Sequence, residues 1–168
     1  NDSGSAYLSL GGEIRERVEL YDAPRFHLAG GTKDGYLLHR AMIHADLHLG
    51  PAVRIFAQLN EQEAVSKKLI NMPDQDNLDV QQLFLELKLS KSAALRAGRQ
   101  EMIFNPMRRF VSFRDAANVR QSFDGARLTV NAGQFRGELF GVAPVLVTSA
   151  MASGLGARGG EPGGRGRP

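Results

Sequence analysis

The stretch YLSLGGEIRERVEL, residues 7–20, decides how the rest of the chain is interpreted. Its even positions carry Leu, Ile or Val five times, and its odd positions are mostly polar or charged. Only Glu16 interrupts the apolar set with a charge. A side-chain period of two is the pattern of a β-strand that has one apolar and one polar face. The stretch therefore predicts a long strand over residues 7–20.

The same alternation recurs along the chain up to about residue 142. The recurring segments are YLLHRAMIHADLHLG (36–50), VRIFAQLNEQ (53–62), QLFLELKL (82–89), GARLTV (125–130) and FRGELFGV (135–142). A further strand that ends in GRQE (98–101) brings the number to about seven. Several segments reach about 10 residues, the length that a tilted strand needs to cross a bilayer.

The connections between these segments alternate between short and long. LGPAV (49–53) and SKSAA (90–94) are hairpin turns, whereas residues 22–35, 64–79 and 105–122 form long loops. This rhythm predicts an all-β fold, an antiparallel up-and-down meander. It is typical of transmembrane β-barrels, which have short turns on one side and long loops on the other. A soluble meander or a lipocalin-like barrel is the alternative from the pattern alone.

The composition excludes several kinds of site. The 168 residues include no cysteine, so no disulfide scaffold or thiolate metal site is expected. His44 and His48 have the spacing of a helical zinc site, but on a strand they lie roughly 13 Å apart. The segment DQDNLD (74–79) lacks the glycine and glutamate of a calcium loop and is interpreted as a solvated loop. No nucleophile or nucleotide motif appears, so we expect neither an enzyme nor a cofactor.

Positive charge is concentrated in one part of the chain. The formal net charge is only +3, which does not suggest a nucleic-acid-binding surface. Residues 96–127, however, hold seven arginines against three acids, a net charge of +4. This segment includes GRQEMIFNPMRRFVSFRD (98–115), which carries four of those arginines. A loop with this composition, folded into a barrel, would form a cationic constriction.

The order of the segments resembles the alginate export family of Gram-negative outer-membrane barrels. The segments at 7–20, 36–50 and 78–87 carry the resemblance, with Gly98-Arg99-Gln100-Glu101 and Phe123-Asp124-Gly125 as its most telling parts. The resemblance covers residues 7–145. It implies a barrel with an arginine-lined pore that passes an anionic uronate polysaccharide such as alginate by diffusion. It also implies outer-membrane lipid, lipopolysaccharide and periplasmic export machinery as partners.

Arginines on the polar faces of the strands and in the 105–122 loop are the candidate pore-lining residues. Arginine stays charged at any relevant pH and binds a carboxylate with two parallel hydrogen bonds. Salt-bridge ladders between strands, or loop contacts with lipopolysaccharide phosphates, are the alternative roles. The candidate set is Arg15, Arg17, Arg40, Arg54, Arg96, Arg99, Arg108, Arg109, Arg114, Arg120, Arg127 and Arg136.

The alternation breaks within GRQE, because Arg99 and Gln100 cannot both face inward on a regular strand. We expect a β-bulge that turns Arg99 inward, with Gly98 and Gly125 as the small positions that allow the bend.

The last part of the chain has a different character. Residues 146–168 are rich in Gly, Arg, Pro and Ala and predict a disordered tail. About seven strands are fewer than a closed single-chain barrel needs. We therefore expect an incomplete N-terminal portion of a larger barrel, ended by truncation or a shifted reading frame. The chain starts at Asn1, which predicts that a signal peptide has been removed.

Three function classes follow from these patterns. The first is an outer-membrane channel for a uronate polysaccharide. The second is a general or uptake porin for small anions, and the third is a soluble β-domain that binds acidic sugars.

Overall fold

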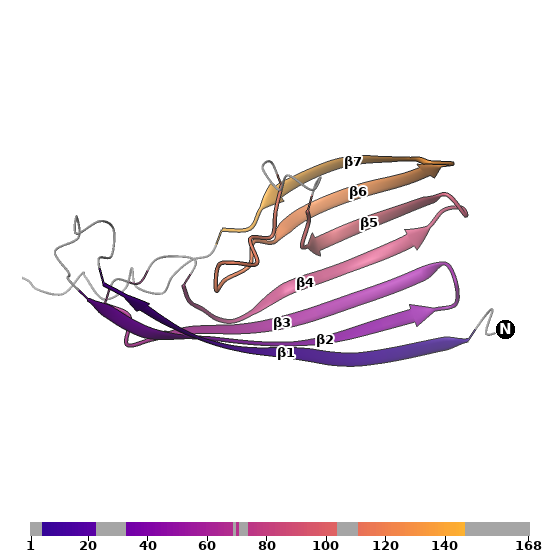
Figure 1. The fold of residues 1–168 in the computed structure, drawn as a ribbon. Coiled ribbons are helices and arrows are strands. Elements are labelled where there is room, and N and C mark those ends of the chain that lie inside the picture. The colour runs from indigo at the N-terminus through magenta and orange to yellow at the C-terminus, as the bar shows by residue number, and fades with distance from the viewer. Residues whose placement is uncertain (1–4, 23–32, 69, 71–73, 104–110, 147–168) are drawn as a thin grey trace, which may run out of the picture.

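The computed structural model describes residues 5–22, 33–68, 70, 74–103 and 111–146. The described chain forms one open antiparallel sheet in which each strand pairs with the next along the chain (Figure 1). The strands are β1 (Ala6–Tyr21), β2 (Asp34–Leu49), β3 (Val53–Val65), β4 (Asp76–Lys88), β5 (Ala93–Gln100), β6 (Phe123–Ala132) and β7 (Phe135–Pro144). The predicted all-β meander of about seven strands is confirmed. The predicted tail, apart from Leu146, lies outside the described residues.

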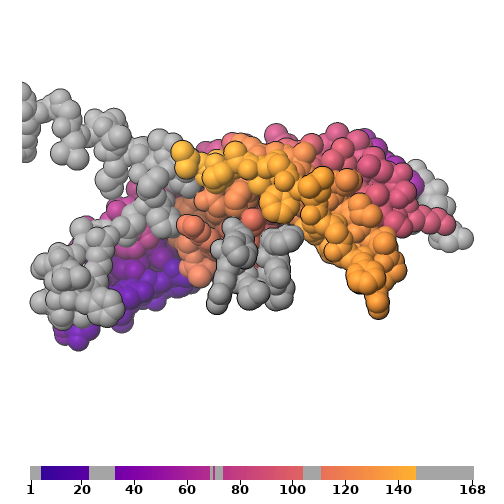
Figure 2. All heavy atoms as spheres, turned by 90° about the horizontal axis from the view of Figure 1, so that it is seen from above, coloured from indigo at the N-terminus to yellow at the C-terminus, as the bar shows by residue number. Residues whose placement is uncertain are grey.

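The sheet is curved, so its two faces differ. The strands follow an arc in Figure 1, and Figure 2 shows the same wall from the β7 side, with the tip of the β6–β7 hairpin standing out in orange. The convex face carries the apolar side chains that the alternation predicts. Leu10, Ile14, Leu20 and Leu139 are each more than 70% exposed there. The odd residues of β1 from Glu13 to Glu19 are partly buried on the concave face.

The buried interior lies on the concave face and is unusually polar. Arg40, Gln62, Gln100 and Asn118 are among the most deeply buried side chains of the described chain. A small apolar cluster of Tyr36, Leu38 and Ala64 lies beside them. An apolar exterior around a polar interior is the reverse of a soluble domain and is the arrangement of a membrane barrel.

The hairpin tips are staggered across the sheet. One continuous row of paired residues runs through Leu49, Val53, Leu87, Leu95, Leu128 and Leu139. The strand ends lie at increasing distances from this row. β2 ends in the row itself, at Leu49. β5 begins at Ala93, two residues beyond the row, and β6 ends at Ala132, four residues beyond it. The stagger is therefore about one residue per strand. With a rise of about 3.3 Å and a strand spacing of about 4.8 Å, it corresponds to a tilt of roughly 35°.

Two expectations for individual segments are wrong. The 64–79 segment is not a continuous loop, because β4 begins at Asp76, which pairs with Gln62. Asp74 is not solvated but buried, and its carboxylate lies 2.6 Å from the Lys67 ammonium. Two register shifts in the β3–β4 pairing accommodate this polar extension of β4.

The expected β-bulge at GRQE is also absent, since pairing of β5 is continuous through Gly98, Arg99 and Gln100. Two glycines instead face each other across β5 and β6 at this point. Gly98 has a φ of 122° and Gly125 a φ of 152°. A Cβ atom at Gly98 would lie 2.3 Å from the Leu83 carbonyl oxygen, and one at Gly125 would lie 2.2 Å from the Gly141 carbonyl oxygen. Both positions therefore need glycine.

Glu16, the one charge in the apolar set of β1, has a partner on the same face. It pairs across the ladder with His39, and its carboxylate lies 2.5 Å from the His39 ring nitrogen.

The described residues contain no helix long and apolar enough to cross a membrane.

Candidate functional site on the concave face

The segment 111–122 of the long connection between β5 and β6 lies across the concave face. Asn118 fixes it there, since its side-chain amide donates hydrogen bonds to the carbonyls of His39 (2.9 Å), Glu63 (3.3 Å) and Asp74 (2.8 Å). Asn118 is only 1% exposed. One buried amide thus ties the segment to β2, to β3 and to the chain just before β4.

Three strand arginines hold the backbone of this segment. Arg15 donates to the carbonyls of Asp115 and Ala117, each at 3.0 Å, and Arg17 donates to the carbonyl of Ala116 at 2.8 Å. Arg40 reaches the Ala117 carbonyl at 3.5 Å. Guanidinium groups suit this role because each presents several donors in a fixed plane. The docked segment is therefore bound through its backbone by residues of β1 and β2.

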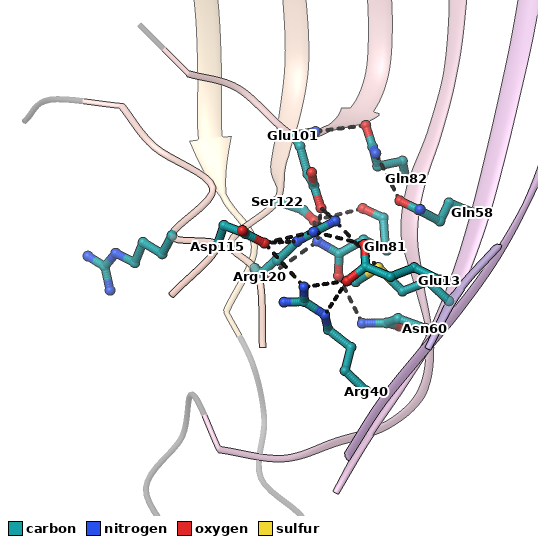
Figure 3. Close-up of polar contacts among 12 residues, drawn as sticks. Glu13, Arg40, Gln58, Asn60, Gln81, Gln82, Glu101, Asp115, Arg120 and Ser122 are labelled. Atoms are coloured by element: carbon teal, nitrogen blue, oxygen red, sulfur yellow. Dashed lines mark hydrogen bonds and ion pairs between the residues drawn. The ribbon is translucent and has the colours of Figure 1, made fainter. Parts of the chain in front are cut away.

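An ion-pair network joins the segment to the strands (Figure 3). Arg40 donates to Glu13 at 2.5 Å and to Asp115 at 3.2 Å. Arg120 donates to the same two carboxylates, at 3.1 Å and 2.8 Å, and lies 3.8 Å from Glu101. Arg40 and Arg120 therefore point from opposite sides toward a shared pair of acids, and the strands form an arc around them.

We call this group the loop-covered cluster. It contains four arginines and four acids, so its formal charge is balanced. Its members are Glu13, Arg15, Arg17, Glu19, Arg40, Glu101, Asp115 and Arg120, with Glu19 included through its 2.7 Å ion pair with Arg17.

The surroundings shift the acidity of the loop groups. Burial alone would raise the pKa of Asp115, but the bonds and charges of Arg120 and Arg40 outweigh it, and the pKa of that carboxyl lies below its usual value. Burial raises the pKa of Glu101 although the nearby Arg120 charge opposes the shift. Burial would lower the pKa of Arg120, yet its acidic neighbours raise it. Arg120 is thus firmly cationic in the docked segment.

Neutral amides fill the wall beside the loop-covered cluster. Asn60 donates to Gln81 at 2.8 Å, and Gln81 donates to the Ser122 hydroxyl at 2.9 Å. Gln82 donates to Gln58 at 2.9 Å. The alternation marked Gln58, Asn60 and Gln82 as polar, but it carried no signal that the side chains bond to one another. These amides connect β3 and β4 to the end of the docked segment without adding charge.

A second group of charges lies nearer the short turns. Arg54 binds Asp46 with two hydrogen bonds of 2.8 Å, and Arg96 binds Glu86 at 2.5 Å and 2.8 Å. The Phe84 ring lies close to both guanidinium groups, whose central carbons are 5.5 Å and 4.0 Å from its centroid. Such cation–π contacts restrict the two arginines to fixed positions.

The remaining charges of this group lie on β4, β6 and β7. Arg127 is 4.0 Å from Glu138, and Arg136 donates to the same carboxylate at 2.6 Å. Lys88 completes the group on β4. We call it the short-turn cluster, and with five cations and three acids its formal charge is +2. Its members are Asp46, Arg54, Glu86, Lys88, Arg96, Arg127, Arg136 and Glu138.

The structure brings eight of the twelve candidate arginines together on the concave face, in these two clusters. Arg99 lies instead in the row of Leu83 and Asp124, and it bonds to Asp124 at 3.0 Å and 3.3 Å. Arg114 is exposed on the docked segment. Arg108 and Arg109 lie outside the described residues. The assignment of all twelve to the pore lining stays a prediction.

An open antiparallel wall with an apolar convex face and a charged concave face defines the class of protein, that of the membrane β-barrels. The family model described as alginate export matches residues 6–154, and the chain belongs to that family. No curated protein and no solved structure gave a significant match to it.

Membership confirms the resemblance and gives the chain its general role. The family is one of outer-membrane channels for alginate and not of enzymes, so the chain takes part in alginate export at the outer membrane. Within the described residues no group of three or more His, Asp or Glu side chains is arranged to hold a metal ion.

Proposed function

We propose that the concave face lines a pore through which an anionic uronate polysaccharide such as alginate diffuses, without cofactor or chemical step. One observation carries the proposal, namely the opposite character of the two faces. The convex face exposes Leu10, Ile14, Leu20 and Leu139, while the concave face carries the two arginine clusters. A wall with these faces separates hydrocarbon from a charged aqueous channel.

The stagger of the hairpins supports a transmembrane orientation. If the three short turns lie at one level of the membrane, the strands tilt by roughly 35°, within the range of about 35–45° that barrels require. The apolar residues then form a band around the outside. This arrangement makes outer-membrane lipid the partner of the convex face and disfavours a soluble β-domain, which would leave that face in water.

The concave arginines suit a polymer that must bind weakly and move on. Arginine offers each uronate carboxylate a bidentate contact, and the acid beside each arginine competes for the same donors. Arg54 with Asp46 and Arg96 with Glu86 are such pairs. Exchange between an internal acid and a substrate carboxylate would let the polymer pass from one arginine to the next.

The docked segment supplies the narrow part of the proposed pore. Arg120 and Asp115 project from it into the concave space, where they contact strand residues. Lipopolysaccharide as the partner of exposed loop groups such as Arg114, and periplasmic export machinery at the short-turn side, remain further proposals.

A conductance experiment tests the proposal. The full protein in planar bilayers is expected to conduct anions better than cations, and polyuronate added to one side should block the current. Neutral dextran of the same length serves as the control and should block much less. Conductance that polyuronate leaves unchanged would instead favour a porin for small anions. A protein that stays in water without detergent would contradict both channels.

A further inference from the structure

The short-turn end of the concave face contains a cavity that members of the short-turn cluster help to line. Its volume is about 220 Å³, and its wall includes Tyr7, His48, Arg54, Glu86 and Lys88. Drug-sized ligands occupy pockets of about 300–1,000 Å³, so this cavity has room for a single sugar ring and not for several. The β2–β3 turn (50–52) and Val53 at the start of β3 also line it.

Two aromatic rings form one wall of the cavity. The rings of Tyr7 and His48 project from neighbouring strands and stack at a centroid distance of 4.4 Å with an interplanar angle of 9°. Tyr7 remains 53% exposed, so the ring pair presents apolar surface to the solvent-filled space. The His48 ring is held in place by Asp46, whose carboxylate lies 3.2 Å from its Nε2 atom. A flat aromatic surface of this kind can cover the apolar C–H face of a pyranose.

The other wall of the cavity holds a cation, Lys88, that makes no ion pair with the described residues. Asp46 already binds Arg54, and Glu86 already binds Arg96. Lys88 is exposed, and among the described residues no carboxylate lies within ion-pair distance of its ammonium group. The backbone amide of Lys88 donates to the Ala52 carbonyl at 2.8 Å, which fixes the strand end at this position. The cavity therefore has one free positive charge opposite an aromatic wall.

We infer that this cavity is a binding subsite for one uronate residue, with the sugar ring on Tyr7 and His48 and the carboxylate on Lys88. The inference rests on the proposed function, because it assumes a uronate polymer in the channel. The subsite is separate from the loop-covered cluster. Gln62 of β3 pairs with Arg40 of that cluster and lies eight residues from Arg54, so the two regions are roughly 26 Å apart along the strand.

The position gives the subsite a role in capture. The short turns of bacterial outer-membrane barrels face the periplasm, so a polymer that leaves the cell meets this end first. A single weak site there would hold the leading sugar while the next residues reach Arg54 and Arg96. It would raise the rate at which chains enter the channel and have little effect on their passage through the docked segment.

The test uses two pairs of matched variants of the full protein in planar bilayers at low salt. Lys88→Gln is compared with Lys91→Gln, which removes the same charge from the adjacent turn outside the cavity. Tyr7→Leu is compared with Tyr21→Leu, which changes a tyrosine at the opposite end of β1 that stacks on Tyr36. The chain has no cysteine, so a Lys91→Cys variant with an impermeant thiol reagent identifies the short-turn side.

The measured quantity is the rate at which a uronate hexamer, prepared from alginate, starts to block the current. We expect Lys88→Gln and Tyr7→Leu each to lower this rate about threefold when the hexamer is added on the short-turn side. The two control variants, and addition on the long-loop side, should give the wild-type rate. Hexamer that blocks the wild type and both cavity variants equally would overturn the subsite alone. A wild-type channel that the hexamer never blocks would overturn the proposed function together with the subsite.

Discussion

The loop-covered cluster and the short-turn cluster lie on the same concave face, yet they use arginine in different ways. In the first, Arg15, Arg17 and Arg40 bind the docked segment, and four acids balance four arginines. In the second, five cations meet three acids, and no loop covers them within the described chain. The number of arginines therefore does not measure the local charge, because the acids within reach decide it.

The comparison changes where selectivity is expected. The sequence places the positive excess in residues 96–127, which include the long loop. In the structure, Arg120 of that loop is surrounded by Glu13, Glu101 and Asp115. Arg96 and Arg127 of the same stretch belong to the short-turn cluster, where the excess remains. We therefore expect the docked segment to set the width of the passage and the short-turn cluster to set its preference for anions.

The row of residues between the clusters gives the prediction with the largest effect. Gly98→Ala places a methyl group 2.3 Å from the Leu83 carbonyl oxygen at a φ of 122°, so the backbone must shift. We expect a loss of roughly 3 kcal/mol in the free energy of unfolding. Urea unfolding in detergent, followed by circular dichroism, measures it. Gly141→Ala is the control, since nothing lies within 4 Å of its Cβ position. Equal midpoints for the two variants would show that the close contact is not needed.

The second prediction concerns the loop-covered cluster. Arg120→Gln leaves Glu13, Asp115 and Glu101 with one fewer cation. We expect it to lower the free energy of unfolding by about 2 kcal/mol and to release the docked segment. Single-channel conductance should then rise. Arg114→Gln removes an exposed charge from the same segment and should leave both quantities unchanged. A wild-type conductance in Arg120→Gln would contradict the view that this network holds the segment in the passage.

The third prediction concerns the ion selectivity that the short-turn cluster gives the channel. Arg127→Gln should lower the ratio of anion to cation permeability about twofold, and Glu138→Gln, which removes its acidic neighbour at 4.0 Å, should raise it. Reversal potentials across a salt gradient measure the ratio, and the effect should shrink as ionic strength rises. The opposite signs are the test, because a general loss of structure would move both variants in the same direction.

The fold was largely predictable, since each strand carries its own two-residue alternation. For example, residues 7–20 lie within β1, and residues 135–142 lie within β7. The start of β4 was not predictable in this way. Asp76 and Asp79 look like loop residues, and only pairing with β3 shows that they belong to a strand. Local alternation is a property of one strand, whereas strand ends in a sheet depend on the neighbour.

The candidate site was predictable in residue type but not in partnership. The alternation places Arg15, Arg40 and Arg54 on the polar face. It could not show that Arg15 binds loop carbonyls, because that contact depends on how a segment about 100 residues away folds back. It also could not show that Arg54 binds Asp46, because that contact depends on the register between β2 and β3. The alternation placed Lys88 on the polar face of its strand but did not mark Tyr7, and only the cavity that they share connects the two.

The smallest effect is expected from pH, through two loop acids with opposite shifts. The pKa of Asp115 is lowered in the docked state, so its carboxylate stabilises docking at neutral pH. This stabilisation is lost as the pH falls through the folded pKa, which lies below the usual value of a carboxyl group. The pKa of Glu101 is raised by burial, so its contribution favours docking in acid and is lost as the pH rises through its folded pKa. Wild-type conductance should therefore increase once the pH falls far enough to protonate Asp115.

The matched variants Asp115→Asn and Glu101→Gln separate these two contributions. Asp115→Asn removes a half-exposed partner of Arg40 and Arg120, and it should give a modestly higher conductance at neutral pH with no further step in acid. Glu101→Gln keeps an acceptor for Gln81, which lies 3.0 Å away, and removes the cost of burying a charge, so it should follow the wild-type curve. If both variants behave alike across the titration, the docked segment does not depend on the carboxylate that the two arginines share, and the loop-covered cluster would be held by backbone contacts alone.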